Sequence, residues 1–129
     1  MSAENQQERL DPNWIVGFTD GEGCFTISLI KIKNRKRQHQ IFPEFRVVQH
    51  QRDEQLLKEL RDYFGFGKIT INHGDRKEFR VRRREELMKI IGFFKQYPLK
   101  TSKQKSFEIF CEVIVMMNNK EHLTTEGLK

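Results

Sequence analysis

The stretch Ile-Val-Gly-Phe-Thr-Asp-Gly-Glu-Gly, residues 15–23, decides how this chain folds. A side-chain acceptor followed by a proline precedes it, and this pair predicts a short helix over residues 12–20. Gly21 and Gly23 can adopt backbone angles that other residues avoid, so we expect the chain to turn sharply from the helix into a strand. Glu22 is then expected to be held at a fixed corner.

Two pairs of strand-like segments follow. Residues 24–33 and 41–49 are rich in β-branched and aromatic side chains, and they predict a long hairpin with a basic tip. Pro43 indicates an edge or bulged position in the second of these strands. Residues 68–73 and 77–83 alternate with period two and predict a second hairpin.

Three further helices are predicted by apolar residues at helical spacing. The first follows the first hairpin and ends at Gly65, and the second runs from Glu85 to about residue 96, before Tyr97 and Pro98. The third begins near Ser102, with that hydroxyl as its cap, and continues to Met117. The segment from Thr124 is similar to the start of another helix, which the end of the chain at residue 129 would leave truncated.

The order of elements predicts an α+β fold. Two hairpins form a small four-stranded sheet, antiparallel or mixed, with the helices confined to one face. The opposite face is expected to be uncovered, and its side chains are basic and polar. Because a two-stranded ribbon fits the major groove of DNA, this face is a candidate surface for nucleic acid. We expect a polar tail over residues 1–10 and one domain over residues 11–129.

The composition favours a polyanionic partner. Lysine and arginine number 24 against 18 aspartates and glutamates, which gives a net charge of +6. The two cysteines, Cys24 and Cys111, lack zinc spacing and indicate buried thiols in a reducing compartment. No apolar run is long enough to cross a membrane, and the polar start is typical of neither a signal peptide nor a transit peptide. We expect a soluble protein that, if it works in an organelle, is made there.

Residues 15–23 resemble the LAGLIDADG motif at each of its nine positions, and the order of elements is similar to that of the same family over almost the whole chain. The resemblance implies a homing endonuclease, an enzyme that cuts both strands of a specific DNA site across the minor groove. It also implies a divalent cation, Mg²⁺ or another hard cation such as Mn²⁺ or Ca²⁺, because phosphodiester hydrolysis needs charge neutralisation and an activated water.

The resemblance assigns three catalytic residues. Glu22 is the expected metal-binding carboxylate, with Gly21 beside it as a second metal ligand. Gln49 is expected to position water, and Lys103 to activate solvent or to stabilise charge in the transition state. Without the resemblance, Gln49 and Lys103 are equally typical of ordinary surface residues.

The resemblance also implies a homodimer on a pseudo-palindromic DNA site. Gly17 and Gly21 lie four residues apart on one helical face, so two such helices can approach closely. Since the chain carries one such motif, the second helix must come from another copy. Asp20 resembles the family residue that hydrogen-bonds backbone or cap groups across this interface. The expected interface residues are Trp14, Gly17, Phe18, Asp20 and Gly21.

DNA reading is expected from the uncovered face and the hairpin tip. Glutamine, asparagine and arginine can make two-point contacts to purine edges, whereas lysine suits phosphates. Two isoleucines on this face could touch thymine methyl groups or respond to DNA shape, and the sequence leaves this open. The expected DNA-binding residues are Thr26, Ser28, Ile30, Ile32, Lys36, Arg37, Gln40, Arg46, Lys68, Thr70, Asn72, Lys77, Arg80 and Arg82.

Two other functions remain open at this point. Relatives with this fold can act as maturases that help their own intron RNA to splice, and a non-cleaving DNA-binding protein would share the same surface. The carboxylate Glu22 between two glycines favours cleavage. The resemblance to intron-encoded enzymes indicates an organelle, either a mitochondrion or a chloroplast, and leaves the target sequence unspecified.

Overall fold

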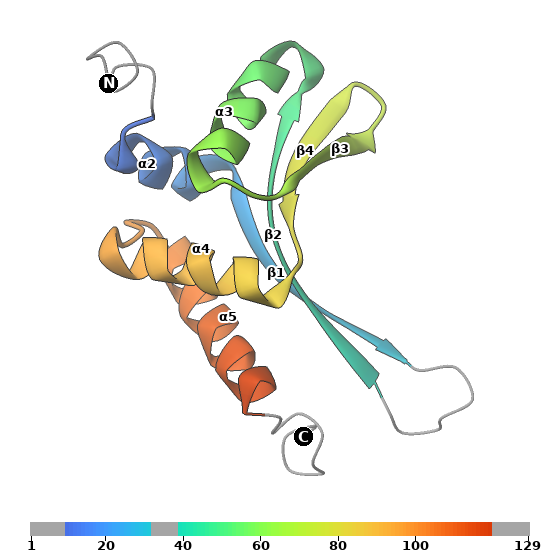
Figure 1. The fold of residues 1–129 in the computed structure, drawn as a ribbon, viewed down its shortest axis with the longest axis vertical. Coiled ribbons are helices and arrows are strands. Elements are labelled where there is room, and N and C mark those ends of the chain that lie inside the picture. Colours follow the sequence, from blue (N-terminus) through green and yellow to red (C-terminus); the bar gives the residue numbers. More distant parts are fainter. Residues whose placement is uncertain (1–9, 32–38, 120–129) are drawn as a thin grey trace.

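All the helices lie on one side of a single sheet in the computed structural model, which describes residues 10–31 and 39–119 (Figure 1). The sheet leaves its other side uncovered, as predicted. The expected C-terminal helix from Thr124 lies outside the described residues. The elements are α2 (Pro12–Glu22), β1 (Gly23–Lys31), β2 (His39–His50), the short 3-10 helix η1 (Gln51–Asp53), α3 (Glu54–Phe64), β3 (Lys68–His73), β4 (Arg76–Val81), α4 (Arg84–Gln96) and α5 (Lys103–Asn118).

The four strands are ordered β1-β2-β4-β3, and every neighbouring pair is antiparallel, so the mixed alternative is excluded. Both expected hairpins are confirmed. Pro43 pairs with Ile27 of β1, while the pairing of β2 with β4 begins only at Phe45. The proline therefore lies in an otherwise central strand, in the part that has a neighbour on one side only, where a missing N–H breaks no ladder.

Two of the helix ends follow the sequence signals. Asp11 caps α2 by accepting a hydrogen bond from the amide of Asn13 (2.7 Å), and Gly65 ends α3 with a left-handed backbone angle, φ 82°. The prediction that Ser102 caps α5 through its hydroxyl is wrong, because this side chain makes no capping hydrogen bond. The hydroxyl of Thr101 instead accepts from the amide of Lys103 (3.2 Å).

The turn from α2 into β1 also differs from the prediction. The helix continues through Glu22, and Gly23 has ordinary extended angles, φ −78° and ψ 163°, so neither glycine is there for an unusual backbone conformation. Gly23 is instead required by close packing. A Cβ atom at this position would lie 2.5 Å from Cγ2 of Thr19 and 3.0 Å from its carbonyl oxygen. The strand can leave the helix this tightly only without a side chain.

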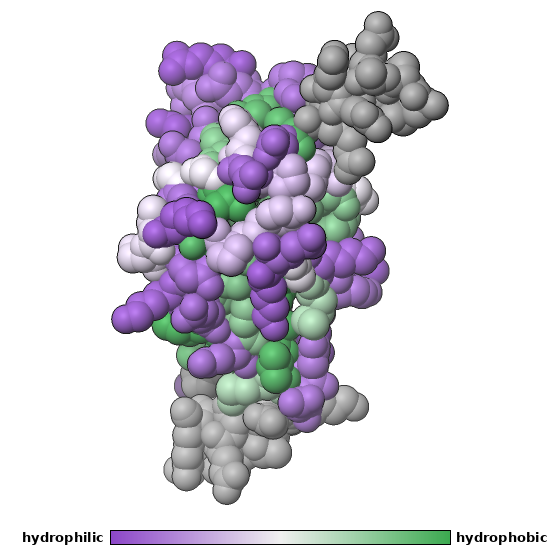
Figure 2. All heavy atoms as spheres, turned by 90° about the vertical axis from the view of Figure 1, so that its left-hand side faces the viewer, coloured by the Kyte–Doolittle hydropathy of each residue, from purple (hydrophilic) through white to green (hydrophobic). Residues whose placement is uncertain are grey.

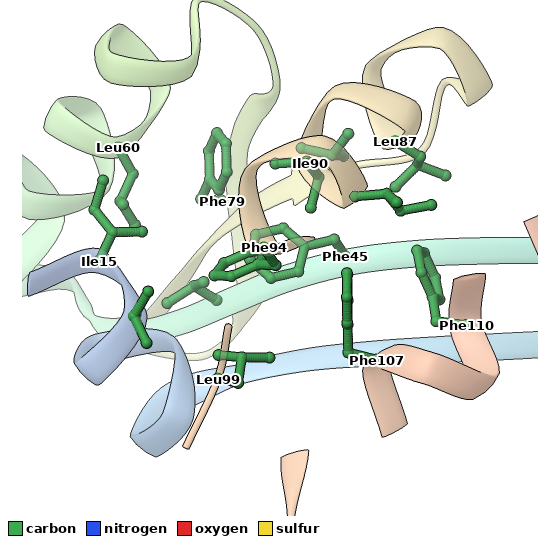
Figure 3. Packing of buried hydrophobic residues seen from close by; sticks show 14 of the residues in the cluster. Ile15, Phe45, Leu60, Phe79, Leu87, Ile90, Phe94, Leu99, Phe107 and Phe110 are labelled. Carbon is green, nitrogen blue, oxygen red and sulfur yellow. The ribbon is translucent and has the colours of Figure 1, made fainter. Parts of the chain in front are cut away.

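The core between the sheet and the helices combines aliphatic residues with a cluster of phenylalanines (Figure 3). Phe25 of β1 packs its ring 5.0 Å from Phe45 of the neighbouring strand and 5.3 Å from Phe107 of α5, measured between ring centroids. Phe94 of α4 closes the cluster at 5.7 Å from Phe25. Offset and edge-on aromatic pairs add to the stabilisation that burial alone gives, so this cluster fixes α4 and α5 on the sheet.

Asp20 joins the end of α2 to the start of α5. Its carboxylate accepts hydrogen bonds from the amide of Lys100 (2.8 Å), from the amide of Thr101 (3.1 Å) and from the Thr101 hydroxyl (2.7 Å). Partial burial by itself would raise the pKa of the Asp20 carboxyl, but these hydrogen bonds and the positive charge of Lys103 together lower it below its ordinary value. The motif helix is thereby fixed to α5 within one chain.

Substitution of Gly23 by alanine should destabilise the fold. The added methyl would overlap Thr19, and relieving such overpacking costs about 1–3 kcal/mol. Gly92, exposed in the middle of α4, is a matched control because a Cβ there meets nothing within 4 Å. Gly92→Ala should leave stability unchanged or raise it by up to about 1 kcal/mol. Urea unfolding of both variants checks this, and equal effects would refute the packing explanation.

The contribution of Asp20 should depend on pH. Since the pKa of its carboxyl is lowered on folding, its stabilisation is present above the ordinary value of 3.8 and is lost as the pH falls below that value. The unmodified chain should therefore have a higher melting temperature than Asp20→Asn at neutral pH, and the difference between the two melting temperatures should narrow between about pH 4 and pH 3. Asp62→Asn, which removes an exposed carboxylate from α3, controls for net charge. A difference that stays constant down to pH 3 would contradict the assignment.

Candidate active site and nucleic-acid interface

Glu22 is the last residue of α2 and is exposed. Its side chain makes no hydrogen bond or ion pair with any residue that the structure describes. The carboxylate is therefore available to a ligand from outside the chain. Its position is well defined nonetheless, because Thr19 packs against Gly23 on one side and Asp20 is bonded to the segment before α5 on the other.

Lys103, the first residue of α5, lies beside this corner. Its ammonium group donates a hydrogen bond to the carbonyl oxygen of Gly23 (2.5 Å), and the side chain is half-buried. This contact places a positive charge one residue from Glu22. The structure thus brings together two of the three residues that the sequence predicted to be catalytic.

Gln49 lies near the same end of the sheet. The first residue of β1, Gly23, pairs with Val47, so Gln49 extends two residues beyond the point where β1 begins. Its amide nitrogen donates to the carbonyl oxygen of Val48 (2.9 Å). The structure shows no bond from it to Glu22 or Lys103, so its proposed part in positioning water stays a prediction.

The outer face of α2 has no side chain at two of its positions, Gly17 and Gly21. Gly17 and Gly21 are both exposed, and a Cβ atom at either position would meet nothing within 4 Å. Trp14 stacks on Phe18 beside them at 4.9 Å between ring centroids, and the tryptophan stays 41% exposed. Figure 2 faces the side of the molecule on which α2 lies and shows pale and green patches among the purple. The helix therefore buries one face in its own core and leaves an apolar, glycine-containing face open.

The end of α2 fits part of a site for a hard cation. The carboxylate of Glu22 and the carbonyl oxygen of Gly21 are hard oxygen donors, and the last carbonyls of a helix have no partner within it. A Mg²⁺ ion takes about six oxygen ligands, so other donors must complete the shell. The residues that the structure describes hold no cluster of three or more histidine, cysteine, aspartate or glutamate side chains.

The uncovered side of the sheet, which we call the open face, carries a row of cations. Arg46 of β2 pairs in register with Arg80 of β4, and Arg80 pairs with Lys68 of β3. Like charges directly opposite one another in neighbouring strands destabilise a sheet. The chain nonetheless places three in line, and the side chains of Arg80 and Lys68 have no hydrogen bond or ion pair to any described residue. An anion lying over this row would remove the repulsion.

A hollow continues the row at the junction of β4 and α4. It has a volume of about 300 Å³, and four of its six lining residues are cationic. The lining residues are Gly67, Lys68, Arg80, Arg82, Arg83 and Glu86.

Most of the predicted DNA-binding residues lie on the open face, by register and alternation. This group comprises Thr26, Ser28, Ile30, Gln40, Arg46, Lys68, Thr70, Arg80 and Arg82. Asn72 lies at a register shift in β3 and donates to the Glu78 carboxylate (3.0 Å). Three predicted residues, Ile32, Lys36 and Arg37, lie outside the described residues.

Lys77 is on the other side of the sheet, contrary to the prediction. It shares the face of Phe79, where its ammonium group lies 3.7 Å from the carboxylate of Glu54 in α3. Strict alternation along β4 explains this, since residues 77 and 79 must point the same way. Lys77 therefore supports the attachment of α3 to the sheet.

The open face is also less uniformly basic than predicted. Glu44 lies among its arginines, and Glu78 is nearly buried at 7% exposure. Phe42, 40% exposed, pairs with Ser28 on the same face. Alternation along β2, counted back from Arg46, would have placed both Glu44 and Phe42 here. The prediction missed Glu44 and Phe42 because it described this face by its basic and polar residue types and not by position along the strand.

None of the helices in the described part of the chain is long and apolar enough to cross a membrane.

Comparison with known proteins places these features in one family. A sequence model described as LAGLIDADG endonuclease matches residues 15–114. The chain is 40% identical over 118 residues to an uncharacterized 50.9 kDa protein in ND4 intron 1 of Podospora anserina. The matched region makes up 89% of this chain and 26% of that protein. The chain is 36% identical over 107 residues to the probable intron-encoded endonuclease Cox1-I1b of Schizosaccharomyces pombe, covering 82% and 27%. The chain thus spans about a quarter of the length of these two relatives.

Solved structures agree with the sequence match. The homing endonuclease I-TnaI superposes with a TM-score of 0.88 at 48% identity, covering 93% of this chain and 82% of that one. The meganuclease I-CpaMI, bound to uncleaved DNA, gives a TM-score of 0.87 at 36% identity, covering 92% and 40%. The motif helix with its open glycine face, the helix-backed antiparallel sheet and these matches agree, and the chain belongs to the LAGLIDADG endonuclease family.

Proposed function

We propose that this chain is a site-specific DNA endonuclease that works as two copies joined through α2 and cuts both DNA strands with a divalent cation. The observation that carries the proposal is the position of Glu22. Its carboxylate is exposed and unpaired among the described residues, and it lies beside the ammonium group of Lys103 at the base of an uncovered basic sheet. A carboxylate in such a setting has no evident structural use.

The open face supports double-stranded DNA as the substrate. Three cations aligned across β2, β4 and β3 have unfavourable contacts with one another, and a phosphate backbone would offset them. The relatives I-CpaMI and I-SmaMI have been solved bound to DNA, and both share this fold at more than a third identity. We propose that this chain's sheet binds one half of a pseudo-palindromic site.

The outer face of α2 supports pairing between two copies. Two helices can approach closely where Gly17 and Gly21 leave their backbones uncovered. The chain covers 40% of the I-CpaMI chain, so that relative has room for two units of this size in one polypeptide. In the chain described here the second motif helix would come from another copy, which would bring two Glu22 carboxylates to one axis.

Cleavage would use the groups at the end of α2. Glu22 and the Gly21 carbonyl would hold the cation, which supplies charge neutralisation and an acidified water. Lys103, fixed on the Gly23 carbonyl oxygen, would place its positive charge where negative charge develops on the phosphate. Gln49 would orient water from the neighbouring strand. The calcium-containing structure of I-SmaMI, a relative at 37% identity, supports a hard divalent cation.

The biological setting is inferred from the relatives. The names of these relatives refer to introns, including ND4 intron 1 and a Cox1 intron. We propose that this protein is likewise intron-encoded, that it promotes intron homing, and that it acts in the organelle in which it is made.

Replacement of Glu22 by glutamine should abolish cleavage and preserve binding. Glutamine keeps the size of the side chain but removes the charge that a cation requires. The measurement is linearisation of a plasmid carrying a site selected from a randomised library, in Mg²⁺ and in EDTA, with binding followed by gel shift. The unmodified chain should cut only with the metal, and Glu22→Gln in neither condition.

Glu112→Gln is the matched control, since it removes an exposed carboxylate from α5, away from the motif. It should cut like the unmodified chain. Cleavage by Glu22→Gln at an undiminished rate would refute the catalytic assignment. An unmodified chain that binds its selected site and never cuts would identify a non-cleaving DNA-binding protein, and preference for intron RNA over DNA would identify a maturase.

Replacement of Gly17 by leucine should separate the motif helices. Among the described residues, nothing beyond the neighbouring backbone of α2 lies within 4 Å of a Cβ there, so the fold of one copy should be unaffected. The dimer should weaken by at least about tenfold, because the leucine side chain prevents close backbone approach. Gly92→Leu, at another exposed helical glycine, is the control. Sedimentation equilibrium decides this, and an unchanged dimer would exclude α2 as the interface.

A further inference from the structure

Glu44 is an acidic residue in a surface that we propose to bind DNA, and its contacts give it a use. Its side chain is only 12% exposed and lies between two arginines of the open face. One carboxylate oxygen accepts a hydrogen bond from Nε of Arg82, and the other lies 3.8 Å from a terminal nitrogen of Arg46. The carboxylate therefore lies below the arginines and not at the surface, where it would repel phosphate.

The atom of Arg82 that Glu44 binds decides the consequence. A guanidinium group has five N–H donors in a rigid planar fork. Glu44 takes the Nε–H, so the two terminal nitrogens at the far end have no hydrogen bond to any described residue. These two nitrogens are the ones that can contact O6 and N7 of a guanine together. Arg82 is 58% exposed and lines the hollow at the end of β4, so there is room above it.

The register of the sheet holds the pair in place. Val81 pairs with Phe45, so the next residue along β4 comes to lie opposite Glu44. On the other side, the Thr26 hydroxyl bonds the Glu44 backbone carbonyl (3.5 Å), which ties this position to β1. An unbound arginine loses considerable rotamer freedom when it docks on a base, and a carboxylate that holds it beforehand reduces this cost.

We propose that Glu44 is a positioning residue for sequence recognition. It holds Arg82 by its Nε–H so that the terminal nitrogens read one guanine in the major groove of each half-site. The inference rests on the proposed DNA binding by the open face. In this pair Glu44 makes no contact with DNA, and it determines which base pair is accepted through the position of Arg82.

The test compares binding to the selected site, to all single-base changes of it and to a scrambled duplex. Arg82→Ala should relax the preference for guanine at one base pair by about tenfold or more, the range expected for losing a two-point contact. Glu44→Gln should relax the same base pair most, with any smaller change at the base pair that Arg46 contacts, because Arg46 is the other partner of Glu44. Because this variant also removes a negative charge from the face, it should bind the scrambled duplex more tightly than the unmodified chain does.

Glu44→Asp separates positioning from charge. It keeps the carboxylate and shortens the side chain, so it should relax the same base pair while affinity for the scrambled duplex and its salt dependence stay unchanged. The double variant Glu44→Gln, Arg82→Ala should show no more relaxation at this base pair than Arg82→Ala alone. Glu112→Gln controls for net charge, and thermal melting of each variant confirms that it is folded.

Three results would overturn the inference. Strongest relaxation at different base pairs by the two single variants would mean that Glu44 contacts DNA itself, for instance the amino group of a cytosine. Equal changes on every sequence would mean that it acts only through charge, and loss of affinity without any loss of base preference would mean that Arg82 binds a phosphate. Failure of the unmodified chain to bind any DNA site would instead refute the proposed function.

Discussion

The structure depends on the packing of α2, which is buried on one side and carries two exposed glycines on the other. Its inner side, with Ile15, Val16 and Thr19, is buried against the sheet. Its outer side has no Cβ atom at Gly17 or Gly21. Larger residues at those places would favour the helix itself, and their absence leaves the backbone of α2 open to close approach from outside. The exposed end of this helix carries Glu22, the carboxylate that we propose holds the divalent cation.

A second feature is the conflict between stability and binding on the open face. Arg46, Arg80 and Lys68 repel one another across three strands, and the aromatic core on the other side of the sheet has to compensate. Glu44 reduces the repulsion locally through its ion pairs with Arg46 and Arg82, and the nearly buried Glu78 is bonded to Asn72. Both glutamates lie below the exposed cations and leave the positive charge outermost. The same surface can therefore be folded without DNA and remain attractive to it.

The sequence predicted the order of elements, the two hairpins and the helix-free face, because hydrophobic periodicity and turn residues are local signals. Placing Glu22 and Lys103 side by side required the family resemblance, since eighty residues of chain separate Lys103 from its partner Gly23. The resemblance implied that Asp20 bonds backbone or cap groups across an interface between copies. In the structure its three donors lie within the same chain, in a loop with no distinctive pattern.

The role of Gly23 was predicted for the wrong reason. The sequence shows a glycine, and glycine is often needed for unusual backbone angles. The actual reason is that a side chain at this position would clash with Thr19, and only the three-dimensional packing reveals this. Lys77 and Glu44 are the opposite case. Simple alternation along the strand, which can be read from the sequence, predicts the sheet face on which each of them lies.

The tight joint between Thr19 and Gly23 has a geometric consequence for the target. It leaves no hinge between the helix that would join the copies and the strand that begins the sheet, so in the proposed dimer each sheet would be held at a set angle to the twofold axis. Each base pair added between two half-sites rotates one half against the other by about 35° and moves it along the duplex. On the proposed assembly, the enzyme would be tolerant of base changes in the centre of its site but strict about the length of that centre.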